Sequence, residues 1–201
     1  MRKLAFLVPV FAFLCIAQLA SAQQGDVMFG GGTLLSSGSG CTITAGCPEK
    51  GGFYPSVSAD VIFKKRVGFN FETAWKGSQG SYGGPGGQPF RPILTDFNAV
   101  YQPSLNKKVG LDLMAGIGLQ STRFYGFTNT TNCIYFNACF TSTHHFLVDI
   151  GGGVRYYVWR SVFVRPEVHY YHIVNNTDDF SNNDVIRVGA SIGFTIGGPN
   201  D

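Results

Sequence analysis

Charged residues are scarce in this chain of 201 residues. Asp, Glu, Lys and Arg together make up 13% of the sequence, against the ~25% that is usual in soluble domains. Basic and acidic residues nearly balance, with a formal net charge of +3, and two of the basic residues, Arg2 and Lys3, lie in the N-terminal leader. Because nucleic-acid-binding proteins normally present a strongly basic face, this balance argues against a nucleic-acid partner.

A long apolar run is also missing after the first 22 residues. No later stretch approaches the ~20 apolar residues of a helix that crosses a membrane. The leader has a basic start, an apolar stretch over residues 4–19 and an Ala-Ser-Ala sequence at 20–22, which are the marks of a cleaved secretory signal peptide. We therefore predict a signal peptide over residues 1–22 and one mature domain over residues 23–201.

Cysteine is limited to five positions, of which Cys15 lies in the leader. The others form two pairs with C-x5-C spacing, Cys41 with Cys47 and Cys133 with Cys139. Disulfides are expected in an exported protein, either within each pair or between pairs, since four cysteines allow three connectivities. The C-x2-C spacing of common zinc sites is absent, so we predict no metal and no cofactor.

Glycine and aromatic residues, in contrast, are abundant, with 27 Gly and 14% aromatic residues. The clearest pattern lies at residues 184–196, where every second residue is apolar and the residues between are small or polar. A period of two predicts a β-strand with two unlike faces. Its length suits the ~9–11 residues of a tilted strand that crosses a bilayer, with the apolar face toward lipid and the polar face toward a narrow lumen.

Seven earlier segments show the same alternation. The predicted strands are residues 26–35, 53–63, 67–76, 91–101, 109–124, 144–158, 162–174 and 184–196. Their connections alternate between long and short, which places the long loops at one end of an antiparallel sheet and the short turns with both termini at the other. The predicted fold class is therefore all-β, an eight-stranded antiparallel up-and-down transmembrane β-barrel preceded by a cleaved signal peptide.

Two segments call for separate predictions. Residues 77–89 are so rich in glycine that we predict a mobile loop without a strand. Pro166 falls in the middle of the strand at 162–174, and a closed barrel has no edge that tolerates a residue without an N–H group. We therefore predict a local bulge or a weak rung at Pro166.

This pattern resembles the small eight-stranded outer-membrane β-barrel proteins of Gram-negative bacteria, a porin-like family. The resemblance covers residues 23–196. It is carried by the leader, the eight alternating strands, the ending at residues 188–194, and aromatic residues near strand ends: Trp75, Tyr101, Tyr156, Trp159 and Tyr170. The resemblance implies a place in the cell outer membrane, with the lipid bilayer as partner, but no single activity; we expect a monomer.

Charged residues gather at lumen-facing positions of the predicted strands. They are Asp60, Glu72, Asp96, Asp112, Asp149, Arg155, Arg165, Glu167 and Arg187. Buried charges must be paired, and an eight-stranded barrel is just wide enough inside for side chains. The leading hypothesis is a structural or surface-interaction barrel whose lumen is plugged by ion pairs and whose long loops bind an extracellular ligand or a host or surface partner. The alternative is a narrow porin-like channel for ions or small solutes.

A lipid-modifying outer-membrane enzyme is the second alternative. Outer-membrane lipid A deacylases carry a His-x-Ser-Asn motif near the end of a barrel strand, and His172 and Asn175 match its first and last positions. Val174 stands where the serine would be, so no hydroxyl is present to serve as a nucleophile. Asp178 and Asp179, together with His172, also resemble the catalytic residues of an outer-membrane protease. Scattered acidic residues in a loop are more often solvated, and we favour that interpretation. We predict that the protein is not an enzyme.

Overall fold

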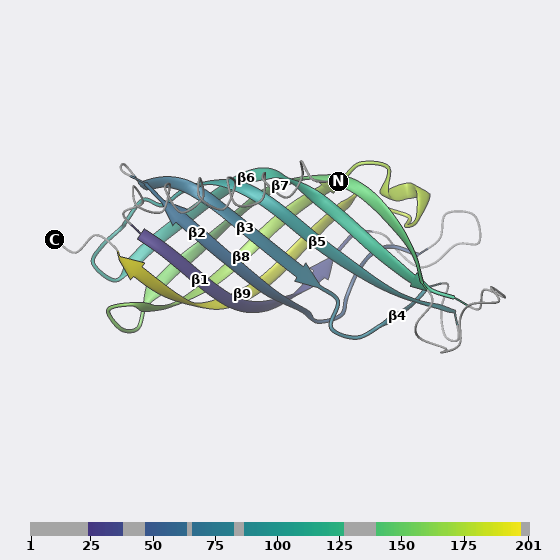
Figure 1. Ribbon diagram of the computed structural model, residues 1–201, viewed down its shortest axis with the longest axis horizontal. Helices are drawn as coiled ribbons and strands as arrows, with labels where there is room; N and C mark the ends of the chain where they lie inside the picture. The colour runs from purple at the N-terminus through teal and green to yellow at the C-terminus, as the bar shows by residue number, and fades with distance from the viewer. Residues whose placement is uncertain (1–23, 38–46, 64–65, 83–86, 127–139, 198–201) are drawn as a thin grey trace, which may run out of the picture.

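A closed β-barrel forms the body of the protein in the computed structural model (Figure 1). The structure describes residues 24–37, 47–63, 66–82, 87–126 and 140–197. The strands are β1 (Gln24–Leu35), β2 (Tyr54–Ile62), β3 (Val67–Trp75), β4 (Gly80–Tyr82), β5 (Gln88–Tyr101), β6 (Val109–Tyr125), β7 (Phe140–Tyr157), β8 (Val162–Ile173) and β9 (Asp184–Gly197), with one 3-10 turn, η2 (Asn176–Asp178), before β9. Among these residues no helix is long and apolar enough to cross a membrane.

Every spanning strand pairs antiparallel with its neighbour in the sequence. The order is β3-β2-β1-β9-β8-β7-β6-β5-β4, and pairing of β3 with β5 closes the cylinder. Eight strands make up the wall, because β4 pairs only with the first residues of β5. The predicted eight-stranded antiparallel barrel is therefore confirmed.

The prediction of a loop without a strand at residues 77–89 is wrong. β4 forms there, and its register places Tyr82 opposite Gln88. The ring of Tyr82 packs edge-on against Phe90 and Phe124, with centroids 6.1 and 5.5 Å apart. These aromatic contacts hold a glycine-rich segment against the wall, and local composition alone does not reveal them.

Apolar side chains cover the outside of the barrel. Leu113 is 47% exposed, Val148 38% and Ile192 61%. Their neighbours along each strand point inward and, apart from several glycines, are buried. In a water-soluble barrel these side chains would pack against one another inside. The outward apolar face confirms the predicted side assignment and fits a wall surrounded by lipid.

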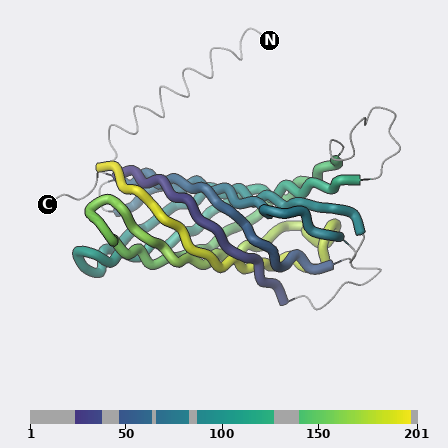
Figure 2. The backbone as a smooth tube through the Cα atoms, turned by 90° about the horizontal axis from the view of Figure 1, so that it is seen from below, coloured from purple at the N-terminus to yellow at the C-terminus, as the bar shows by residue number. Residues whose placement is uncertain are grey.

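The two ends of the cylinder differ. We call one the turn end, because it holds both ends of the described chain, Gln24 opposite Gly197, and three short connections: residues 63–66, 102–108 and 158–161. The other is the loop end. There β6 and β7, of 17 and 18 residues, are much longer than the 9 residues of β2 or β3. Figure 2 shows the first and last strands meeting at the turn end, and the β6–β7 hairpin projecting from the loop end.

Pro166 produces a weak rung, one of the two predicted outcomes, and no bulge. β8 keeps an unbroken register with β9, in which Pro166 lies opposite Ala190. Toward β7 the pairing stops after Gly153↔Glu167 and resumes at Tyr156↔Val164 in the same register. The missing N–H of the proline therefore interrupts two rungs on one side without adding a residue to either strand.

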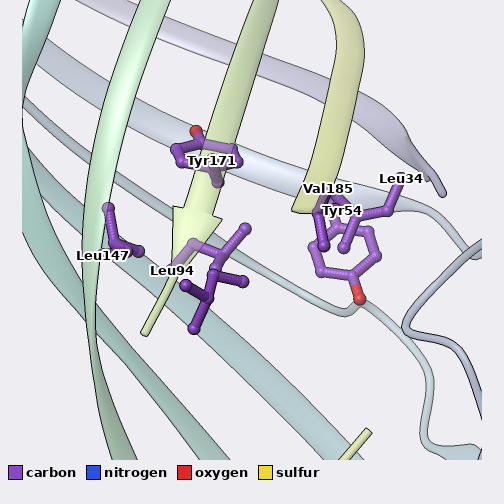
Figure 3. Packing of buried hydrophobic residues seen from close by; sticks show 7 residues of the cluster. Leu34, Tyr54, Leu94, Leu147, Tyr171 and Val185 are labelled. Atoms are coloured by element: carbon purple, nitrogen blue, oxygen red, sulfur yellow. The ribbon is translucent and has the colours of Figure 1, made fainter. Parts of the chain in front are cut away.

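Buried apolar clusters flank the charged middle of the lumen on both sides. Near the turn end, Ile62, Val100 and Met114 form a buried cluster. Toward the loop end a larger buried layer converges from several strands (Figure 3): Leu34, Tyr54, Leu94, Leu147, Tyr171, Ile173 and Val185. Between them the inward positions are polar, and they form the candidate site.

Candidate functional site

All nine charged residues predicted to face the lumen do so, and none is more than 6% exposed. They are Asp60, Glu72, Asp96, Asp112, Asp149, Arg155, Arg165, Glu167 and Arg187. They come from β2, β3 and β5 to β9, so side chains far apart in the sequence meet inside the cylinder. We refer to this set and its partners as the lumen network.

Arg155 is the centre of the half of the network nearer the turn end. Its guanidinium donates to Asp26, to Asp60 at 3.0 Å and to Asp112 at 2.9 Å. It also lies over the ring of Phe163, 4.1 Å from the centroid. One buried cation therefore serves three carboxylates from three strands, as a planar guanidinium with five N–H donors can do.

Arg165 and Arg187 continue the network upward. Arg165 donates to Asp112 at 3.2 Å and to Glu167 at 2.8 Å. Arg187 donates to Glu167 at 3.2 Å and pairs with Glu72. Because Asp112 and Glu167 are each shared between two guanidinium groups, the three arginines form one connected chain of ion pairs.

His169 occupies the top of the network. Its Nδ1 lies 3.0 Å from Asp149 Oδ2, and its Nε2 lies 3.9 Å from Glu72 Oε2. Its ring stacks on Tyr171 with centroids 5.8 Å apart, and the Tyr171 hydroxyl donates to Asp96 at 3.5 Å. The imidazole thus joins the charged middle to the apolar layer above it.

Neutral amides add hydrogen bonds to two of the lumen carboxylates, Asp60 and Asp96. Asn70 donates to Asp60 at 2.5 Å, and Asn98 donates to Asp96 at 2.6 Å. Gln102 also donates to Asp60, at 3.2 Å. The carboxylates outnumber the guanidinium groups in this lumen, so amide donors supply hydrogen bonds that the arginines cannot.

Sequence reasoning missed Asp26 and His169 as members of the network. Both are buried, at 1% and 0% exposure. The alternation of the strands indicated their side of the wall. Asp26 precedes the outward Val27, and His169 lies on the same face of β8 as Arg165 and Glu167. Strand alternation was therefore sufficient to place them inside, although not to name their partners.

One group in the lumen has the spacing of a metal site. Single ligand atoms of Glu72, Glu167 and His169 all lie within 4.8 Å of one another, and all three residues are buried. Arg187 pairs with both glutamates. A guanidinium in that position supplies the positive charge that a metal ion would bring, so the geometry favours an ion-paired network over a metal centre.

A second, smaller polar cluster lies at the loop end, above the apolar layer. Glu49 accepts from Gln120 at 2.9 Å and from Asn176 at 3.3 Å. Phe180, fully buried, packs with Tyr82 and Phe90, with centroids 5.9 and 5.5 Å away. The β8–β9 connection therefore folds inward and covers the mouth of the barrel.

Burial raises the pKa of Glu49 from 4.5 to about 7, despite the opposing hydrogen bonds from Asn176 and Gln120. The folded protein then binds a proton between pH 4.5 and about 7 that the unfolded chain does not. Stability should accordingly fall as the pH rises through this window, by roughly 3 kcal/mol, and then level off. Denaturant unfolding from pH 4.5 to 8 should show this fall in wild type, with a smaller fall in Glu49→Gln. Equal slopes in the two proteins would contradict the assignment.

The barrel geometry and the sequence match one family. The model of the outer membrane protein beta-barrel domain matches residues 6–194. The chain belongs to this family. Solved structures support the same fold. Ail of Yersinia pestis has 12% sequence identity and a TM-score of 0.55, and the match covers 87% of this chain and 99% of that one. Neisserial surface protein A has 14% identity and a TM-score of 0.59, and the match covers 85% of this chain and 95% of that one.

The N-terminal barrel domain of Pseudomonas aeruginosa OprF is a further similar structure, with 13% identity, a TM-score of 0.52 and coverage of 87% of this chain and 98% of that domain. No curated protein sequence matches the chain. As an outer membrane beta-barrel domain the protein resides in the outer membrane. The usual layout of such barrels places the turn end in the periplasm and the loop end outside the cell.

His172 of the deacylase motif lies on the outer wall of this outer membrane barrel. His172 Nδ1 is 2.7 Å from Asp184 Oδ1, which also accepts from the Tyr170 hydroxyl at 2.7 Å. The side chains of His172 and Asp184 are about half exposed, and Val174, at the serine position of the deacylase motif, is 39% exposed. The His–carboxylate pair is present, but its environment is the membrane boundary, and position 174 offers no nucleophile.

Asp179 lies in the β8–β9 connection, where its side chain is 12% exposed. Its Oδ2 is 2.9 Å from His145 Nε2, so it is not the solvated loop acid that the sequence predicted.

Of the four cysteines predicted to form disulfides, the structure describes only Cys47. Cys47 is buried and disulfide-bonded. Cys41, Cys133 and Cys139 lie outside the described residues, so the pairing within or between the two C-x5-C pairs stays a prediction. The signal peptide over residues 1–22 also lies outside them.

Proposed function

We propose that the protein is a non-conducting, non-enzymatic barrel of the outer membrane that acts through its extracellular surface. The observation that carries this proposal is the filling of the lumen. Three arginines, their carboxylates and His169 occupy the middle, and apolar layers lie on both sides of it. A hydrated ion would have to displace buried ion pairs and then cross mainly apolar side chains that offer it few ligands.

The loop end supports a surface role. The loop-end parts of β5, β6 and β7 extend beyond the ends of β2 and β3 (Figure 1). Near the described tip of the β6–β7 hairpin, the Arg123 guanidinium lies 4.8 Å from the ring centroid of Phe140, a residue that is 48% exposed. Loops and hairpin tips on a rigid scaffold are where binding residues concentrate, so the extracellular partner is expected to contact this projection.

A narrow channel is the rival function, favoured by the excess of lumen carboxylates over guanidinium groups. Planar bilayers decide between the two. We expect a flat current record from purified, folded protein, while a porin inserted in the same membranes gives steps. Stepwise currents from wild type that change with Asp96→Asn would establish a conducting lumen and overturn the proposal.

A further inference from the structure

Positive charge is concentrated on the exposed rim of the turn end. Arg66, Lys107, Lys108 and Arg160 are all exposed there. The sequence of the three turns, residues 63–66, 102–108 and 158–161, contains no Asp or Glu, and it adds two further lysines at positions 64 and 65. We call the four exposed residues the basic rim.

The loop end has no such excess. Its bases and acids are equal in number: Lys50, Lys76, Arg91 and Arg123 against Glu49, Asp178, Asp179 and Asp184. The lumen network is acidic, but it is enclosed by the wall. The positive charge of the mature chain is therefore directed to one end of the molecule, and it is the end that the family layout places in the periplasm.

Backbone hydrogen bonds join the turns that carry the basic rim. The Gln102 N–H donates to the Arg66 carbonyl at 2.8 Å, and the Tyr157 N–H donates to the Lys108 carbonyl, also at 2.8 Å. Asn106 Oδ1 accepts from the N–H groups of Lys108 and Val109 at 2.8 Å. The cations consequently stand on a connected edge of the barrel, where several can approach the same layer of ligands.

Exposed aromatic and apolar side chains fix the depth of this edge. Trp159 is 71% exposed, Tyr101 48% and Tyr156 49%, and Leu105 is 65% exposed in the same region. Tyr and Trp collect where a membrane meets water, at the level of the lipid head groups. Arg160, next to Trp159 in the chain, thus lies at the height of lipid phosphates and not free in the periplasm.

From this charge, depth and connectivity, we propose that the basic rim binds the head groups of anionic phospholipids in the periplasmic leaflet. Guanidinium and ammonium groups donate charge-assisted hydrogen bonds to phosphate oxygens. A head group with a net negative charge is attracted to several cations at once. A zwitterionic head group also carries a positive ammonium group, which the cations of the basic rim repel. Carboxylates of a periplasmic polymer would also suit the charge, but they would not explain the exposed tryptophan and leucine beside the cations.

The two tryptophans of the chain allow a direct test. Trp159 lies beside the basic rim and Trp75 ends β3 at the opposite end of the barrel. The Trp75→Phe protein is reconstituted in vesicles that contain both phosphatidylglycerol and phosphatidylcholine. In each measurement one of the two lipids is brominated near the glycerol end of its acyl chains, and the quenching of Trp159 fluorescence by the two brominated lipids is compared. We expect phosphatidylglycerol to be favoured by about fivefold or more, since each basic residue near an anionic surface contributes about that factor, and the preference should weaken in high salt.

The matched variant replaces all four rim cations by glutamine in the Trp75→Phe background, with folding checked by heat-modifiable gel migration. Its Trp159 should be quenched about equally by the two lipids. In the Trp159→Phe background, Trp75 should report the same lipid preference with and without the glutamines. Equal quenching of Trp159 in the unsubstituted rim, or an unchanged preference after substitution, overturns the proposal. The proposal is also overturned if the protein shows no lipid preference and the detergent-solubilised protein instead co-sediments with murein sacculi in a way that depends on these four cations.

Discussion

Replacing Arg155 by methionine is expected to lower the free energy of unfolding by about 3–5 kcal/mol, the range measured when one partner of a buried ion pair is removed. Asp26, Asp60 and Asp112 all accept from this guanidinium, and each is buried. Methionine fills a similar space but donates no hydrogen bond. The carboxylates would then repel one another in a lumen that excludes water. Urea unfolding of the protein in lipid vesicles measures the loss.

Two controls separate this effect from a general cost of substitution. Arg160→Met makes the same chemical change at an exposed turn. In vesicles of zwitterionic lipid, where the basic rim has no anionic head group to bind, this variant should change stability by less than about 0.5 kcal/mol. Combining Arg155→Met with Asp26→Asn and Asp112→Asn removes two of the three charges that Arg155 had paired, and leaves Asp60 with the Arg165 guanidinium 3.7 Å away. This triple variant should restore much of the loss. If Arg155→Met and Arg160→Met were equally stable, the lumen network would not be a source of stability.

The rescue distinguishes stability from function. A buried ion pair is weak evidence for stability, because an apolar replacement of all its partners is often neutral. If the triple variant is as stable as wild type, the retention of Arg155 and its acids would point to another requirement, such as the unique stagger of the barrel. The conductance measurement on the same variant would show whether that requirement is a closed lumen.

Strand alternation predicted which residues face the lumen, but the pairs within it depend on the stagger of the barrel. Arg155 meets Asp26, 129 positions away in the sequence. Alternation with a period of two assigns each residue to a face and leaves open how far one strand slides along the next. The nine lumen residues could therefore be named from the sequence, whereas the role of Arg155 as their hub could not.

Strand alternation did not predict the structure of the loop end, because residues there are held by contacts with distant parts of the chain. β4 lies in a glycine-rich segment with no alternation, and its position depends on rings of Phe90, Phe124 and Phe180 supplied by other parts of the chain. Glu49 likewise looks like a solvated loop acid in the sequence, yet it is 1% exposed beneath the β8–β9 connection. Tertiary contacts override local composition at both positions.

Gly116 is the position where one added methyl group is expected to damage the barrel most. It faces the lumen on β6, opposite Asn98 of β5 and Asp149 of β7. A Cβ atom built there would lie 2.6 Å from Asn98 Cα and closer still to the Phe97 carbonyl and the Asn98 amide oxygen. Backbone cannot yield as a flexible side chain can, so β5 and β6 would have to separate. Gly116→Ala should cost about 3–4 kcal/mol, at the upper end of overpacking effects.

Gly110 provides the matched control on the same strand and the same face. A Cβ atom there would meet its nearest neighbours, Arg155 Cβ and the Pro103 carbonyl, at 3.7 and 3.9 Å, which is ordinary contact. Gly110→Ala should be neutral or slightly stabilising, because alanine loses less backbone entropy on folding. Heat-modifiable migration and urea unfolding of the two variants measure the difference. Equal stability would mean that β5 and β6 can move apart without cost, and the close packing that keeps the lumen network dry would then have to be attributed to other strands.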